Sequence, residues 1–287
     1  MNILQRHHLA YKLQSAILGV NWPVNAQEPD YVATLVSTLP GLIRNALTHY
    51  LPGRAIASGS AFIHQKPLAH FLNRPGMSDP ELGDLLIVCR EKRFSGVVYN
   101  SMLLQAKFTN APLHTSIPND HQYVLYSEWP EFEYKRAGVL NGKRRSILPK
   151  VITQGAQYLL IVGPEPLRLF TATVDRPLYS SKLFARTLAA ILSFDAGRTF
   201  QASNPHDDWS QMVLDLLRLT ASSVYTRRNS GCVKAKRWNG AAAFEYILSL
   251  GMQEEEKKEA QQVHGDYDAE SISGISVVCV DLGEMQE

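Results

Sequence analysis

One stretch, residues 81–108, limits most strongly what this chain can fold into. Its sequence is ELGDLLIVCREKRFSGVVYNSMLLQAKF, in which two apolar runs are separated by a charged segment that ends at Gly96. This pattern predicts two strands joined by a polar turn. Because both runs are rich in apolar residues, we expect both strands to be buried in a sheet.

Three polar residues of this stretch are candidates for a function. Asp84 precedes the first run, and Gln105 and Lys107 lie near the end of the second. Side chains alternate along a strand, so Gln105 and Lys107 are expected on one face. Such groups are costly in a core unless they are paired or used. Carboxylate and amide oxygens suit Mg²⁺, and a Lys ammonium suits a charged phosphate. The three residues therefore predict a site for phosphodiester hydrolysis.

The same residues carry a family resemblance. An Asp, 20 intervening residues and then Gln-x-Lys resembles the core of the PD-(D/E)xK nuclease superfamily. It is similar to the variant in Mrr-like restriction nucleases, where Gln stands in place of the usual acid. The resemblance implies a restriction-endonuclease-like core and a Mg²⁺-dependent deoxyribonuclease, with Mn²⁺ as the other candidate cofactor. It assigns catalysis to Asp84, Gln105 and Lys107, and metal binding to Asp84 and Gln105.

One feature departs from that family. Its first core helix often supplies an acidic metal ligand, yet residues 31–49 contain neither Asp nor Glu. Glu81, three residues before Asp84, is the remaining candidate for an extra metal-binding carboxylate. Two other interpretations stay open. Asp84, Gln105 and Lys107 could be ordinary turn and surface residues, or the chain could be an inactive nuclease-fold subunit that binds nucleic acid or serves as a scaffold.

Two basic segments are candidates for binding DNA. Residues 135–150 hold six basic residues and no acid, and the Asn141-Gly142 turn precedes the run Lys143, Arg144 and Arg145. Residues 216–240 are also free of acids and contain Arg227 and Arg228. Such loops suit a phosphate backbone, although solvated turns have the same composition. His64 and Lys66 are two further polar residues in apolar surroundings and are candidates for lining a cleft.

The composition restricts the partners and the compartment. The net charge is only +2, so a nucleic-acid surface must be a local patch. Three scattered cysteines indicate reduced thiols in a cytoplasmic protein rather than a disulfide framework. No window approaches 18 uninterrupted apolar residues, which predicts no membrane-spanning helix and no membrane partner. The expected partners are DNA and either a partner subunit or further copies of the chain.

The order of the expected elements predicts an α/β (α+β) fold with a central mixed β-sheet flanked by helices. We expect helices over residues 1–20, 30–50, 182–194, 241–250 and after residue 208, with an interruption at Pro40-Gly41. Strands are expected over residues 157–163, 169–174 and 274–280. We divide the chain into an α/β domain, 1–200, and a helical C-terminal elaboration, 201–287, whose last strand returns to the core. The resemblance further implies an effector of bacterial restriction or antiviral defence.

Overall fold

A central mixed β-sheet organises the molecule, as the sequence predicts. The computed structural model describes residues 1–63, 67–110, 114–115, 120–150, 155–163, 166–174, 178–179, 182–226, 246–247, 249–250 and 274–283. Within them, eight strands form the central sheet in the order β1, β13, β3, β4, β8, β9 and β11, while β12 pairs with the first half of β4. The pairs β13–β3 and β4–β8 are parallel and the rest antiparallel. These strands are β1 (Ala57–Ala61), β3 (Leu85–Arg93), β4 (Gly96–Thr109), β8 (Ala156–Val162), β9 (Arg168–Ala172), β11 (Lys182–Leu183), β12 (Arg198–Phe200) and β13 (Ser276–Asp281).

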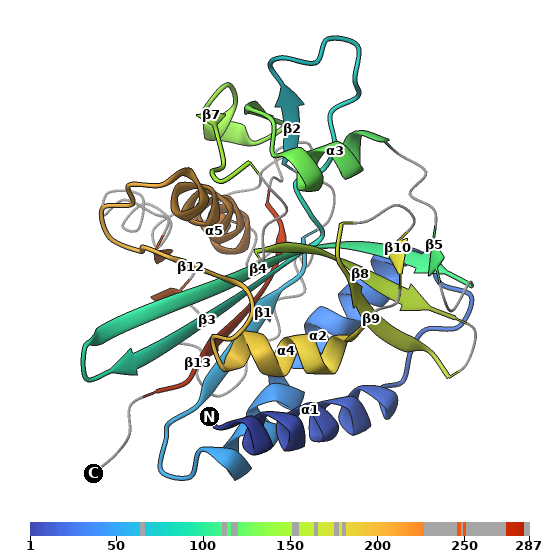
Figure 1. Cartoon of the computed structure of the whole chain (residues 1–287), viewed down its shortest axis with the longest axis vertical. Helices are drawn as coiled ribbons and strands as arrows, with labels where there is room; N and C mark the ends of the chain where they lie inside the picture. The colour runs from blue at the N-terminus through green and yellow to red at the C-terminus, as the bar shows by residue number, and fades with distance from the viewer. Residues whose placement is uncertain are drawn as a thin grey trace.

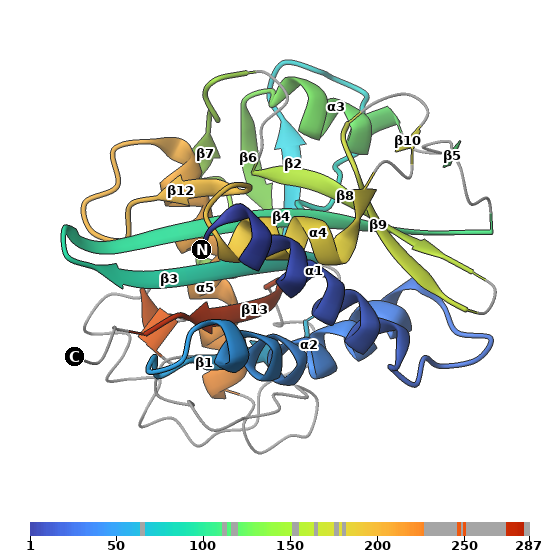
Figure 2. The ribbon, with the colours of Figure 1, turned by 60° about the horizontal axis from the view of Figure 1, so that its bottom comes forward.

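Helices cover both faces of this sheet and enclose two hydrophobic cores (Figures 1 and 2). One face packs against α1 (Ile3–Leu18), α2 (Glu28–Tyr50) and α4 (Phe184–Leu192). The other face packs against α3 (Asp120–Glu128), α5 (Asp208–Thr226) and a small sheet of three strands. That small sheet consists of β2 (Leu68–Phe71), β6 (Phe132–Lys135) and β7 (Arg144–Arg145), with a 3₁₀ turn at Gly138–Leu140; β5 (His114–Thr115) pairs with β10 (Leu178–Tyr179).

The hairpin predicted from residues 81–108 is present as β3 and β4. Leu85 pairs with Leu104, and the register continues to Arg93 opposite Gly96. The charged segment therefore extends the strands beyond the core and leaves only Phe94 and Ser95 as the turn. Gly96 has φ 120°, a conformation that glycine adopts at no steric cost.

The interruption expected at Pro40 is wrong, because α2 runs through it without a break. Proline has no amide hydrogen, so the carbonyl of Val36 loses its helical partner. The Ser60 hydroxyl on β1 donates to that carbonyl at 2.7 Å, and the Ser58 hydroxyl donates to the carbonyl of Pro40 at 2.8 Å. Two serines of the sheet thus complete the hydrogen bonding of the helix.

The C-terminal strand lies inside the central sheet. β13 runs parallel to β3 on one side and antiparallel to β1 on the other, and all of its residues are buried. The sequence predicts this return to the core. Most of the helix expected over residues 241–250 lies outside the described residues. Among the helices that the structure describes, none is long and apolar enough to cross a membrane.

Candidate functional site

The candidate site lies where β4 extends beyond its neighbour β3. The first residue of β3, Leu85, pairs with Leu104, so the last residues of β4 have no β3 backbone beside them. Alternate residues of an antiparallel strand direct their N–H groups to the same neighbour. The amides of Ala106 and Phe108 therefore face this uncovered edge and need acceptors from elsewhere.

Two carboxylates supply those acceptors. Oδ2 of Asp84 accepts a hydrogen bond from the Ala106 amide at 2.7 Å, and Oε2 of Glu28 accepts one from the Phe108 amide at 2.8 Å. Asp84 lies just before β3, and Glu28 is the first residue of α2. The end of one strand and the start of one helix thus place two acids along one edge of β4.

Gln105 and Lys107 complete the group, which we call the Asp84 cluster: Asp84, Gln105, Lys107 and Glu28. The side-chain amide of Gln105 donates to Oδ2 of Asp84, and Nζ of Lys107 lies 3.9 Å from Oε1 of Glu28. Asp84 and Gln105 are buried, and the Lys107 side chain is 15% exposed. The three residues singled out from the sequence therefore lie together.

The charges of the Asp84 cluster do not balance. Burial and the negative charges of Glu81 and Glu28 raise the pKa of Asp84, the Ala106 amide and Lys107 lower it, and the net result is a pKa raised from 3.8 to about 7. A carboxyl group placed among other carboxylates and away from water is costly to ionise. This arrangement favours a cation or a proton beside Asp84.

Glu28 is the site residue that the sequence analysis missed. Residues 31–49 contain no acid, but the helix begins earlier, at Glu28. Pro29 favours the first turn of a helix, and Asp30 accepts the Gln27 amide at 3.0 Å. The Glu-Pro-Asp sequence was the available signal for an earlier helix start.

The donor set of the Asp84 cluster fits a hard divalent cation. Among the described residues, no three His, Cys, Asp or Glu side chains lie close enough together to form a ready-made metal group. Mg²⁺, however, typically takes only one or two carboxylates and completes its octahedron with carbonyls and waters. Asp84 and Glu28 would hold the ion here, with Gln105 as a neutral ligand once its amide turns to present the oxygen. Glu81 contributes negative charge near Asp84.

The basic loop after residue 135 has a different role from the one expected. The Arg145 side chain is only 6% exposed, and two of its nitrogens donate to Oδ2 of Asp215 at 2.9 and 2.5 Å. Lys143 donates to Oδ1 of Asp215 at 2.8 Å. Their acidic partner comes from α5, far along the chain. The charge of Arg145 is therefore paired inside the fold, whereas the Lys143 side chain is 43% exposed beside Asp215. Phosphate contact by either residue stays a prediction.

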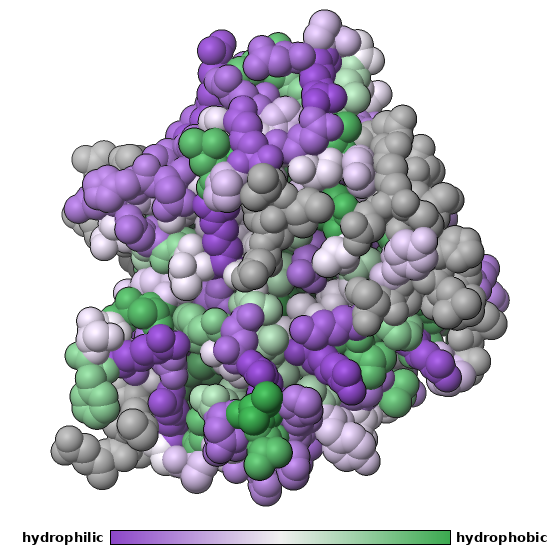
Figure 3. All heavy atoms as spheres, in the orientation of Figure 1, coloured by the Kyte–Doolittle hydropathy of each residue, from purple (hydrophilic) through white to green (hydrophobic). Residues whose placement is uncertain are grey.

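Arg144 differs from its two neighbours. Its side chain is exposed on β7, where the surface over the small sheet is mostly hydrophilic (Figure 3). Arg144 therefore keeps its candidacy for phosphate contact. Arg227, Arg228, His64 and Lys66 lie outside the described residues.

Comparison of the chain with protein-family models, curated proteins and solved structures gives no significant match.

Proposed function

We propose that this chain is a metal-dependent endonuclease that hydrolyses phosphodiester bonds of DNA. The observation that carries the proposal is the convergence of Asp84, Glu28, Gln105 and Lys107 at one strand end with an excess of negative charge. Most buried ionic groups in proteins are paired, and strongly perturbed ones gather at functional sites. The resemblance to PD-(D/E)xK nucleases assigns the same three residues, Asp84, Gln105 and Lys107, to that chemistry.

Each residue has a distinct role in this proposal. A bound divalent cation would neutralise the phosphate and lower the pKa of the attacking water. Asp84 and Glu28 hold that charge in place, and the backbone amides of Ala106 and Phe108 fix the orientation of both carboxylates. Lys107 stabilises the negative charge that develops on the phosphate as water adds and the bond to the leaving oxygen breaks.

A hollow with aromatic walls lies beside the start of α2, and none of the four residues of the Asp84 cluster lines it. It measures about 1110 Å³ and is lined by three aromatic residues, Trp22, Tyr31 and Phe108. Phe108 directly follows Lys107, and its ring stacks on Tyr31 with centroids 5.2 Å apart. Aromatic faces beside a phosphate site can stack on an unpaired base. Phe108 projects to the face of β4 opposite to Lys107, so this hollow is a candidate site for a base on that other face of the strand.

One observation favours the alternative function, a catalytically inactive subunit that binds nucleic acid or acts as a scaffold. Gln105 donates to Asp84, and the nearest carboxylate to the Lys107 ammonium is that of Glu28. The Asp84 cluster is therefore partly satisfied by its own members. Such a subunit would still bind DNA but would cleave it under no metal condition.

The wider setting follows from the resemblance and from the thiols. Mrr-like relatives imply a restriction or antiviral effector, which works with DNA and with a partner subunit or further copies of itself. Cys89 and Cys279 are buried free thiols, as expected for a protein of a reducing compartment such as the cytoplasm.

Cleavage assays test the proposal. Wild-type protein should cut plasmid or linear DNA with Mg²⁺ or Mn²⁺, and Asp84→Asn and Lys107→Met should each reduce the rate by at least about 100-fold. Asp281→Asn is the matched control, because Asp281 is equally buried at the end of neighbouring β13 but is paired with Arg90 at 2.7 Å. Equal activity in wild type and in both site variants would reject the catalytic assignment. DNA binding without cleavage under either metal would favour the inactive subunit.

A further inference from the structure

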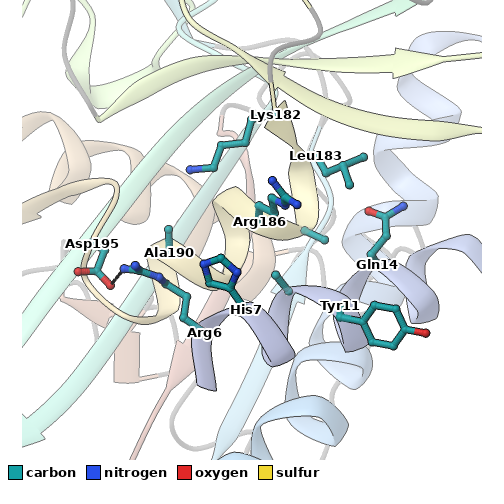
Figure 4. A pocket seen from close by; sticks show the side chains of 11 residues that line it. Arg6, His7, Tyr11, Gln14, Lys182, Leu183, Arg186, Ala190 and Asp195 are labelled. Carbon is teal, nitrogen blue, oxygen red and sulfur yellow. Dashed lines mark hydrogen bonds and ion pairs between the residues drawn. The ribbon is translucent and has the colours of Figure 1, made fainter. Parts of the chain in front are cut away.

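A second hollow lies between α1 and α4, and none of its lining residues belongs to the Asp84 cluster (Figure 4). Its volume is about 490 Å³. Small side chains on the facing helices, Ala10, Ala185 and Ala190, leave space where larger residues would fill the interface. Hollows of this size are typical of small-molecule sites.

Positive charge dominates the walls. Arg6, Lys182 and Arg186 line the hollow together with His7, and Asp195 is the only acidic residue among the lining residues. Asp195 pairs with Arg6 at one end of the hollow (Figure 4). Among the described residues, neither Lys182 nor Arg186 forms an ion pair. Two cations of the β11–α4 junction thus face the hollow without a neutralising partner.

The opposite end of the hollow has a different chemistry. Figure 4 shows Tyr11 and Gln14 on α1 at this end, with Lys182, Arg186 and His7 between them and the Arg6–Asp195 pair. Tyr11 is 76% exposed, which is high for an aromatic side chain. An aromatic face and an amide can contact a base or sugar, while the central cations can contact phosphates.

We propose that this hollow binds a small phosphorylated ligand of the nucleotide class. The phosphates lie between Lys182, Arg186 and His7, and the nucleoside lies toward Tyr11 and Gln14. A DNA duplex is disfavoured, because its phosphates call for cations spread along a surface. This site does not depend on the nuclease function, and ligand binding here can be measured without cleavage.

Calorimetric titration of the full-length protein with ATP in EDTA tests the site, because EDTA removes divalent cations from the Asp84 cluster. ATP should bind saturably to wild type, and Arg186→Glu should weaken it by about tenfold or more. Lys12→Glu is the matched control. Like Arg186→Glu, it replaces a cation by an acid, but Lys12 lies on α1 over the Tyr50 ring and does not line the hollow. This variant should bind ATP as wild type does.

A second variant tests the nucleoside end. Tyr11→Ala should weaken ATP but leave binding of inorganic tripolyphosphate unchanged, because only ATP carries a base. The site is rejected if wild type shows no saturable ATP binding, or if Lys12→Glu and Arg186→Glu weaken it equally. Tripolyphosphate binding as tight as that of ATP would reject the nucleotide class. Binding of a 20-base-pair duplex in place of ATP, with the same dependence on Arg186, would also overturn the proposal.

Discussion

Two buried aspartates of this fold show how differently one residue type is used. Asp215 accepts hydrogen bonds from Arg145, Lys143 and the Tyr134 hydroxyl, so two cations neutralise one carboxylate. Asp84 accepts from an amide side chain and a backbone amide, both neutral, while its nearest charged neighbours include two further acids.

The difference separates a structural role from a functional one. A paired buried charge keeps a fold together and has little left to offer a ligand. A buried carboxylate that lacks a cation costs stability, and folds keep such groups where a ligand later supplies the missing charge. This contrast supports the proposal of a functional site at Asp84 independently of the Gln-x-Lys pattern.

The largest expected effect is the loss of stability on replacing Asp215, the aspartate that is paired with two cations. Asp215→Ala should lower the free energy of unfolding by about 3–5 kcal/mol, because it leaves the buried Arg145 with only Asp208, 3.8 Å away, as a counter-charge. Urea denaturation measures this. The double variant Asp215→Leu with Arg145→Met, which removes both charges, should recover most of the loss. A loss below about 1 kcal/mol in the single variant would show that the pair is not structural.

Asp84 should behave in the opposite way. Folded Asp84 keeps its proton up to about pH 7, whereas the unfolded chain releases it near 3.8. The folded state therefore holds more protons between these values, and its stability falls as pH rises through this window. Asp84→Asn removes that slope and should stabilise the protein by roughly 2 to 4 kcal/mol at pH 8 and hardly at all at pH 4.

A second aspartate variant serves as the control for the stabilisation that we predict for Asp84→Asn. Asp281→Asn breaks the ion pair with Arg90 and should destabilise the protein at pH 8. Urea denaturation of both variants at pH 4 and pH 8 measures these changes in the free energy of unfolding. Destabilisation by Asp84→Asn at pH 8 would contradict the claim that this carboxylate lacks a compensating charge.

Substitutions of Gln105 test whether its side chain is a metal ligand, with a smaller expected effect. Gln105→Glu keeps the shape and adds a negative charge beside Asp84, so it should bind Mn²⁺ about tenfold more tightly and keep or raise cleavage activity. In EDTA the same change should lower stability, because a further carboxylate joins an already negative group. Gln105→Ala should weaken Mn²⁺ binding. Equal Mn²⁺ affinity in all three proteins would exclude Gln105 as a ligand.

The smallest expected effect concerns Arg144. Because its side chain is exposed, Arg144→Ala should change the free energy of unfolding by less than about 0.5 kcal/mol. If Arg144 contacts a phosphate, the slope of DNA affinity against salt concentration should fall by about one unit. An unchanged slope would show that Arg144 does not contact a phosphate.

The sequence predicts the hairpin and its polar residues well, because both depend on local alternation. Asp84 precedes one apolar run, and Gln105 falls opposite it once the hairpin forms in register. Interactions between residues far apart in the chain could not be predicted in this way. Nothing near Arg145 in the sequence indicates that Asp215, on helix α5, will neutralise it. Likewise, Pro40 looks like a helix break until Ser60 of β1 supplies the missing hydrogen bond. The position of Glu28 at the start of a helix could have been predicted, because Glu-Pro-Asp is typical of a first helical turn.

Calorimetric titration with Mn²⁺ tests the central claim most directly, because it measures whether the Asp84 cluster binds a divalent cation. We predict saturable binding by wild type, loss of that binding in Asp84→Asn, and wild-type affinity in Asp281→Asn. The three proteins differ by single carboxylates of equal burial, which lie toward opposite ends of β3. Binding that survives in Asp84→Asn, or no binding by wild type, would contradict the account.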